Sequence, residues 1–150
     1  MAALLGWLAL TFCASATAVF VSSGGWYATL NKPAWNPPSW LFGPAWTLLY
    51  TLMAIAAWLV WKQGGWKTQK QALSLYLLQW ALNALWTPLF FGLHQPGPAF
   101  VEILALDLAV LATLRAFWPV SRAAAWLLVP YACWIAFASA LNFTIWRLNS

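Results

Sequence analysis

The chain has 150 residues, of which 64% are hydrophobic and only 6% are charged. A soluble domain carries about 25% charged residues, so this composition excludes a water-soluble monomer, and its apolar and aromatic richness excludes a disordered chain. Seven Lys and Arg residues against two Asp and Glu residues give a net charge of +5. These charges are too few and too scattered for a nucleic-acid-binding surface. We therefore expect one integral-membrane domain that spans residues 1–150.

Long stretches with little charge predict the transmembrane helices, each of which needs about 20 mainly apolar residues. We expect five helices, near residues 3–23, 40–61, 72–93, 98–118 and 122–147. The fourth stretch qualifies although it contains Glu102, Asp107 and Arg115. The sequence thus predicts an all-α bundle of five transmembrane helices with a long ordered loop between the first two.

The first stretch has one feature of a secretory signal peptide, because Ala14-Ser15-Ala16 resembles a cleavage site. Against that interpretation, no Lys or Arg precedes the stretch, and its apolar run continues to Val21. We therefore interpret it as a membrane-spanning helix.

The basic residues predict the orientation of the bundle. With five spans, the N-terminus shares one side of the membrane with the 62–71 and 119–122 loops. That side carries Lys62, Lys67, Lys70, Arg115 and Arg122. The opposite side carries only Lys32 and Arg147. Because Lys and Arg are enriched in cytoplasmic loops, we expect a cytoplasmic N-terminus.

The loop from Gly24 to Ser39 is the longest and is rich in proline and aromatic residues. Proline fixes φ and removes a backbone donor, so we expect an ordered loop that folds over the end of the bundle as a lid. The alternative is a loop that its tryptophans anchor at the membrane interface.

Three predicted helices each carry aromatic and polar residues on one face, at spacings of three and four. These faces comprise Trp46, Tyr50, Met53 and Ala57; Gln79, Asn83, Trp86 and Phe90; and Tyr131, Trp134, Ala138 and Leu141, with Asn142 beside them. Fourteen tryptophans suit an interfacial belt, but Trp46, Trp86 and Trp134 lie too deep for that role. Asp107 lies midway along the fourth helix, where a carboxylate costs about 2.5–3.5 kcal/mol, so we expect it to face the bundle interior, a water-filled cavity or a partner.

Aromatic walls with a few polar groups are typical of small-molecule sites. The three faces therefore predict a shared cavity for a flat, apolar ligand with a hydrogen-bonding or anionic edge. The alternative is that Gln79, Asn83 and Asn142 only form hydrogen bonds between helices. The sequence has no cluster of Cys and His residues with metal-ligand spacing, and we expect no bound metal or obligatory cofactor.

Four segments carry a resemblance to a known family. They are residues 26–38 (WYATLNKPAWNPP), 42–50 (FGPAWTLLY), 79–92 (QWALNALWTPLFFG) and 130–134 (PYACW), the last continuing to Leu141 and Asn142. In this order they resemble the tryptophan-rich sensory protein family, also called translocator protein or peripheral-type benzodiazepine receptor. The match extends over nearly the whole chain.

The resemblance implies a homodimer in a membrane, here a bacterial cell membrane, that binds protoporphyrin IX, haem-like tetrapyrroles and synthetic benzodiazepine-site ligands. By motif position, the ligand-binding residues would be Tyr27, Pro37, Trp46, Tyr50, Asn83, Trp86, Asp107, Trp134 and Ala138. It also implies a sterol motif near Leu141, but Phe143 replaces its tyrosine, and such motifs are weak. We therefore make no cholesterol prediction.

The resulting hypothesis is a membrane receptor or carrier for tetrapyrroles that regulates porphyrin metabolism or a stress response. The first alternative, from the same resemblance, is an enzyme that degrades porphyrin in light, with Trp46 and Trp134 as the candidate photochemical residues. The second is a small-molecule transporter with Asp107 in its path. The sequence shows no pattern typical of a hydrolytic or metal-centred active site.

Overall fold

The structure is a computed structural model that describes residues 2–16 and 26–150, without the side chains of Tyr27 and Ser39. Within these ranges the regular structure is entirely helical. The elements are α1 (Ala2–Phe12), the 3-10 turn η1 (Cys13–Ser15), α3 (Trp26–Thr29), α4 (Ser39–Trp61), α5 (Gly65–Thr68), α6 (Lys70–Thr87), the π-helix η2 (Pro88–Gly92), α7 (Pro96–Phe117) and α8 (Arg122–Leu148).

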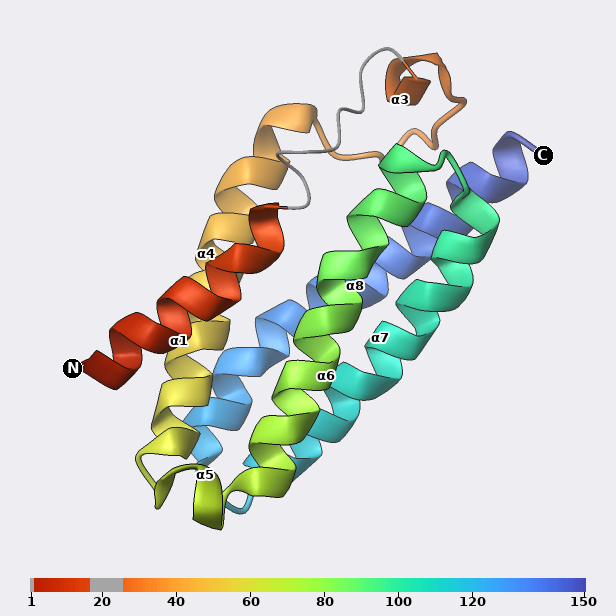
Figure 1. Ribbon diagram of the computed structural model, residues 1–150. Helices are drawn as coiled ribbons and strands as arrows, with labels where there is room; N and C mark the ends of the chain where they lie inside the picture. The colour runs from red at the N-terminus through yellow and green to blue at the C-terminus, as the bar shows by residue number, and fades with distance from the viewer. Residues whose placement is uncertain (1, 17–25) are drawn as a thin grey trace.

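The long helices form one elongated bundle (Figure 1). α4 packs against α1 and α8, while α7 packs against α6 and α8. The contact between α4 and α6 is much weaker. α3 and the C-terminus lie at one end of the bundle, and α5 lies at the opposite end (Figure 1). This arrangement leaves room between α4 and α6 in the half of the bundle near α3.

The expected helix bounds agree closely with α4, α7 and α8. Ser121 explains the start of α8, because its side chain accepts a hydrogen bond from the Ala124 amide at 3.2 Å and caps the helix. Pro38, with extended backbone angles, precedes the first residue of α4. For the first expected helix, 3–23, the structure describes helical residues as far as Ser15, and residues 17–23 lie outside the described part.

The third expected helix, 72–93, differs from the structure near its C-terminal end. Pro88 has no N–H group to bond the carbonyl of Ala84, so the α-helical ladder is interrupted there. The chain widens into the π-helix η2, in which the Leu93 amide donates to the Pro88 carbonyl at 2.9 Å. His94 then adopts φ 54° and ends the element. π-Helical turns are concentrated at functional sites.

The described part of the loop between α1 and α4 is joined to the end of the bundle. The Trp26 ring is stacked on His94, with centroids 4.3 Å apart. The Asn31 amide donates to Asn149 Oδ1 at 2.9 Å, and Asn149 Nδ2 donates back to the Asn31 carbonyl at 2.9 Å. Two helix ends therefore hold this segment, which contains the single turn α3.

Two helices of the described part are long and apolar enough to cross a membrane. They span Trp40–Trp61, with a hydropathy of 1.5, and Arg122–Leu148, with a hydropathy of 1.7. A shorter apolar helical segment covers Ala2–Ser15. α6 and α7 do not meet this criterion: α6 carries the internal amides Gln79 and Asn83, and α7 carries the two acidic residues.

Candidate functional site

A cavity of about 550 Å³ lies between α4, α6, η2 and α8 in the half of the bundle near α3. Phe12 of α1 and Ile103 and Leu106 of α7 complete its wall. Met53, which follows Tyr50 by one turn of α4 toward α5, is not part of the lining and has no exposed surface. Its volume falls within the range of about 300–1,000 Å³ that is typical of small-molecule sites.

Six of the nine residues that the sequence placed at the site line this cavity. They are Trp46, Tyr50, Asn83, Trp86, Trp134 and Ala138. They come from α4, α6 and α8, which are the helices whose faces the sequence had combined. Pro37 lies between α3 and α4 and is not among the described lining residues. Tyr27 belongs to α3, but its side chain lies outside the described part.

Asp107 is also not among the described lining residues. The hydroxyl of Ser139 on α8 lies 2.6 Å from Asp107 Oδ2, and this contact joins α7 to α8. We expected Asp107 to face the bundle interior, a water-filled cavity or a partner. The structure provides a partner, the Ser139 hydroxyl on the neighbouring helix. The other acidic residue, Glu102, is 9% exposed, and neither of its carboxylate oxygens has a hydrogen-bond partner among the described residues.

A chain of buried hydrogen bonds crosses the bundle at the floor of the cavity. Tyr50 Oη donates to Asn83 Oδ1 at 2.9 Å, and Asn83 Nδ2 donates to Tyr131 Oη at 2.9 Å. Tyr131 Oη then donates to Gln79 Oε1 at 2.8 Å. These hydrogen bonds join α4, α6 and α8.

A second polar contact lies nearer the end of the bundle. Trp86 Nε1 donates to Asn142 Oδ1 at 2.9 Å, and Asn142 Nδ2 donates to the Pro96 carbonyl at 2.8 Å. The side chain of Asn142 therefore connects α6, α8 and the start of α7. Asn83 and Asn142 both form hydrogen bonds between helices, as the alternative interpretation expected, and both also line the cavity.

Aromatic rings form much of the remaining wall. The Trp46 ring lies 5.2 Å from Tyr50 and 6.2 Å from Trp134, the latter at an interplanar angle of 85°. Phe42 packs against Trp134 with centroids 5.9 Å apart. Within the described residues, the indole N–H groups of Trp46 and Trp134 donate to no protein group, in contrast to those of Trp80 and Trp86. The wall thus retains two indole donors for a ligand.

Several lining residues escaped the sequence analysis. Phe12 and Ser15 belong to the first helical segment, Phe42 to the first turn of α4, and Phe91 to the π-helix. Spacing alone could have found both aromatic residues, because Phe42 lies four residues before Trp46 on the same face and Phe12 lies three residues before Ser15. The periodicity of an ideal α-helix does not place Phe91 on the face of Phe90, whereas a π-helix changes that register.

The cavity suits a ligand whose buried surface is largely uncharged, because the described lining contains no Asp, Glu, Lys, Arg or His. No group of three His, Cys, Asp or Glu side chains suited to a metal ion occurs within residues 2–16 and 26–150. The chemistry that the described residues offer is aromatic stacking together with hydrogen-bond donation from indole and amide groups.

Comparisons with known proteins identify the family. The profile of the TspO/MBR family matches residues 2–147. The chain is 46% identical to the tryptophan-rich protein TspO of Archaeoglobus fulgidus over 151 residues, which cover 100% of this chain and 96% of that protein. It is 48% identical to the translocator protein of Homo sapiens over 126 residues, or 83% of this chain and 75% of that protein. It is 43% identical to the protein CrtK of Rhodobacter capsulatus over 141 residues, or 91% and 86%. The family resemblance seen in the sequence is therefore confirmed, and the chain belongs to the TspO/MBR family of integral membrane proteins.

Proposed function

We propose that this protein is a membrane receptor or carrier for tetrapyrroles, with protoporphyrin IX or a haem-like molecule as its ligand. The observation that carries the proposal is the cavity of about 550 Å³ with aromatic walls and two uncommitted indole donors. The same cavity would accept drug-like ligands of the benzodiazepine-site class, because these are flat and largely apolar. Binding would then regulate porphyrin metabolism or a stress response.

The chemistry of a porphyrin matches that of the wall. Its macrocycle is a flat π-system that packs against rings such as Trp46, Tyr50 and Phe42. Its carboxylate edge needs donors, and the indole N–H groups of Trp46 and Trp134 supply them without breaking an existing protein hydrogen bond. The amides of Asn83 and Asn142 already have protein partners, so they shape the site more than they compete for the ligand.

Titration of the detergent-purified protein with protoporphyrin IX in the dark tests the proposal, with tryptophan quenching as the readout. Trp46→Phe and Trp134→Phe each remove an indole donor and retain an aromatic ring. We expect saturable quenching by the natural protein and a roughly ten- to hundredfold weaker affinity in each variant, since a hydrogen bond to a charged group contributes about 1.5–3 kcal/mol. Trp126→Phe is the matched control, because Trp126 is 63% exposed on the outer surface.

Linear quenching that none of these substitutions changes would contradict the proposal, because it would mean that porphyrin only partitions into the micelle. Equal weakening by Trp126→Phe would contradict it as well, since that residue lies outside the cavity. Competition by a benzodiazepine-site ligand is expected to shift the porphyrin titration if both ligands occupy the same cavity.

A second candidate function is light-dependent degradation of the bound porphyrin. The perpendicular pair of Trp46 and Trp134 in the cavity wall favours it, because an excited porphyrin in contact with an indole takes an electron from it. Illumination of the complex in the presence of dioxygen distinguishes the functions. Loss of porphyrin absorbance that requires light and both indoles supports an enzyme, whereas binding without such loss supports a receptor.

We further propose how the protein lies in the membrane. α1 with η1, α4, α6 with η2, α7 and α8 would each cross the bilayer, and two copies would associate as a homodimer. The end with α5 would face the cytoplasm together with the N-terminus, because most of the basic residues belong to that end. A bacterial cell membrane suits the similarity to bacterial relatives such as CrtK.

A further inference from the structure

A shallow, open groove of about 490 Å³ lies at the end of the bundle opposite α3. Its lining consists of Ala3, Trp58, Trp61, Lys62, Gly64 and Gly65, from α1, the end of α4 and the turn into α5. Gly64 and Gly65 have φ angles of 114° and 70°, which L side chains rarely adopt. A Cβ added at Gly65 would meet nothing within 4 Å, so the bare backbone leaves this part of the groove open.

The aromatic residues and the lysine of the groove are held in place by neighbouring groups. Lys62 Nζ lies 4.4 Å from the centroid of the Trp58 ring, in a cation–π contact. The Trp61 ring packs edge-on against Trp7, with centroids 6.0 Å apart. Tryptophan and lysine at a helix end are the side chains that occupy the headgroup level of a bilayer.

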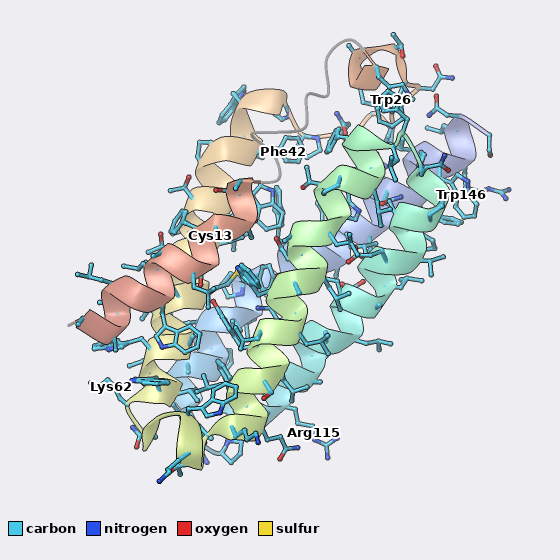
Figure 2. All side chains as sticks on the ribbon, in the orientation of Figure 1. Cys13, Trp26, Phe42, Lys62, Arg115 and Trp146 are labelled. Carbon is cyan, nitrogen blue, oxygen red and sulfur yellow. The ribbon has the colours of Figure 1, made fainter. Side chains whose placement is uncertain are left out.

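This end of the bundle is strongly positive. Figure 2 shows Lys62 and Arg115 at the same end, away from Trp26 and Trp146. Lys67 in α5, Lys70 at the start of α6 and Arg122 at the start of α8 belong to it as well. The only acidic residues of the sequence, Glu102 and Asp107, lie in α7 nearer to its N-terminal end than Arg115 does. No carboxylate therefore neutralises Lys62 at the groove.

We propose that this groove is a binding site for the headgroup of an anionic phospholipid, with the Lys62 ammonium at the phosphate. The adjoining surface of α1 suits the acyl chains, because Gly6 lies one turn from Ala3 on the same face and a Cβ there would meet nothing within 4 Å. A groove with a cationic rim and an apolar continuation fits a lipid better than a soluble anion. The site is separate from the tetrapyrrole cavity and does not depend on that proposal.

Native mass spectrometry of the full chain in detergent tests the site, with phosphatidylglycerol, phosphatidylcholine and inorganic phosphate as probes. We expect retained phosphatidylglycerol and little of the other two, because the ammonium of phosphatidylcholine is repelled at this end. Lys62→Gln is expected to weaken phosphatidylglycerol binding about fivefold, and Lys62→Arg is expected to restore it. Lys67→Gln, at the same end but outside the groove lining, and Lys32→Gln, at the opposite end, are the matched controls.

Three results would overturn the proposal. Equal retention of phosphatidylglycerol and phosphatidylcholine would show that the groove does not select charge. An equal loss of phosphatidylglycerol binding in Lys62→Gln and Lys67→Gln would show that the general positive charge of this end, and not the groove, holds the lipid. Displacement of the lipid by millimolar inorganic phosphate would identify a site for a soluble anion. Far-ultraviolet circular dichroism of the same variants is the fold control, since Lys62 lies at the end of α4 and outside the cavity lining.

Discussion

The hydrogen-bond chain through Asn83 makes a quantitative prediction about three tyrosines. Tyr131 has no exposed surface, and its hydroxyl takes part in two hydrogen bonds, one from Asn83 Nδ2 and one to Gln79 Oε1. Tyr50 makes one such bond, to Asn83 Oδ1, and it lines the cavity. Tyr76 is as buried as Tyr131, but among the described residues its hydroxyl has one hydrogen bond, with Thr11 Oγ1 at 2.5 Å.

Replacement of each tyrosine by phenylalanine removes the hydroxyl and leaves the ring. Hydrogen bonds between membrane helices average about 0.6 kcal/mol and reach about 1.7 kcal/mol. Tyr131→Phe loses two bonds and leaves Asn83 Nδ2 and Gln79 Oε1 unpaired, so we expect the free energy of unfolding to fall by about 1–3 kcal/mol. Tyr76→Phe loses one bond and should cost about 1 kcal/mol. Tyr50→Phe should cost less, about 0.5 kcal/mol, because water in the cavity can replace the hydroxyl.

Reversible unfolding in mixed micelles of a mild detergent and dodecyl sulfate measures these differences. Far-ultraviolet circular dichroism reports helix loss, and tryptophan fluorescence reports the packing of the bundle. The expected order of destabilisation is Tyr131→Phe, then Tyr76→Phe, then Tyr50→Phe. If Tyr50→Phe costs as much as Tyr131→Phe, the number of hydrogen bonds at each hydroxyl does not determine stability, and the reasoning is wrong.

Two further predictions concern the cavity wall and the loop. Ala138→Thr adds two heavy atoms to the wall and should weaken protoporphyrin IX binding about tenfold, since overpacking typically costs about 1–3 kcal/mol. Ala140→Thr on the exposed side of α8 is its control. Equal affinities of the two variants for protoporphyrin IX would show that Ala138 does not line the site. Asn149→Ala deletes the acceptor of the Asn31 amide, so hydrogen exchange at that amide should accelerate several-fold. An unchanged exchange rate would mean that this hydrogen bond does not hold the loop.

The sequence predicted much of the helical framework because the signals there are local. Long apolar stretches and prolines are sufficient to locate α4, α7 and α8 to within about two residues, although α7 contains three charged residues. The departure at Pro88 follows from a missing donor that is also visible in the sequence. What periodicity could not predict is how the chain would respond to that missing donor. A kink, a 3-10 turn and a π-helix are all compatible with the missing donor, and the sequence does not indicate which of them packs against α7, as η2 does.

The candidate site was predictable where polar and aromatic residues share a helix face. That rule found Trp46, Asn83 and Trp134, because polar groups inside a membrane bundle must meet one another. It failed for Phe12, whose place in the wall depends on how α1 packs against α4. It also did not separate the three possible environments of Asp107, since a helical wheel indicates an inward direction but not the nature of the neighbouring group.

The amide side chains in the cavity wall connect helices. Asn83 and Asn142 were expected either to bind a ligand or to join helices, and the structure shows that they join helices from within the cavity wall. Because their oxygens already accept hydrogen bonds from Tyr50 and Trp86, a ligand that competes for them must break a contact between helices. A ligand that takes only the uncommitted indole donors leaves the framework intact. The site should therefore select ligands by flat shape and by acceptor groups at one edge, and loss of either indole should reduce affinity without reducing the stability of the bundle.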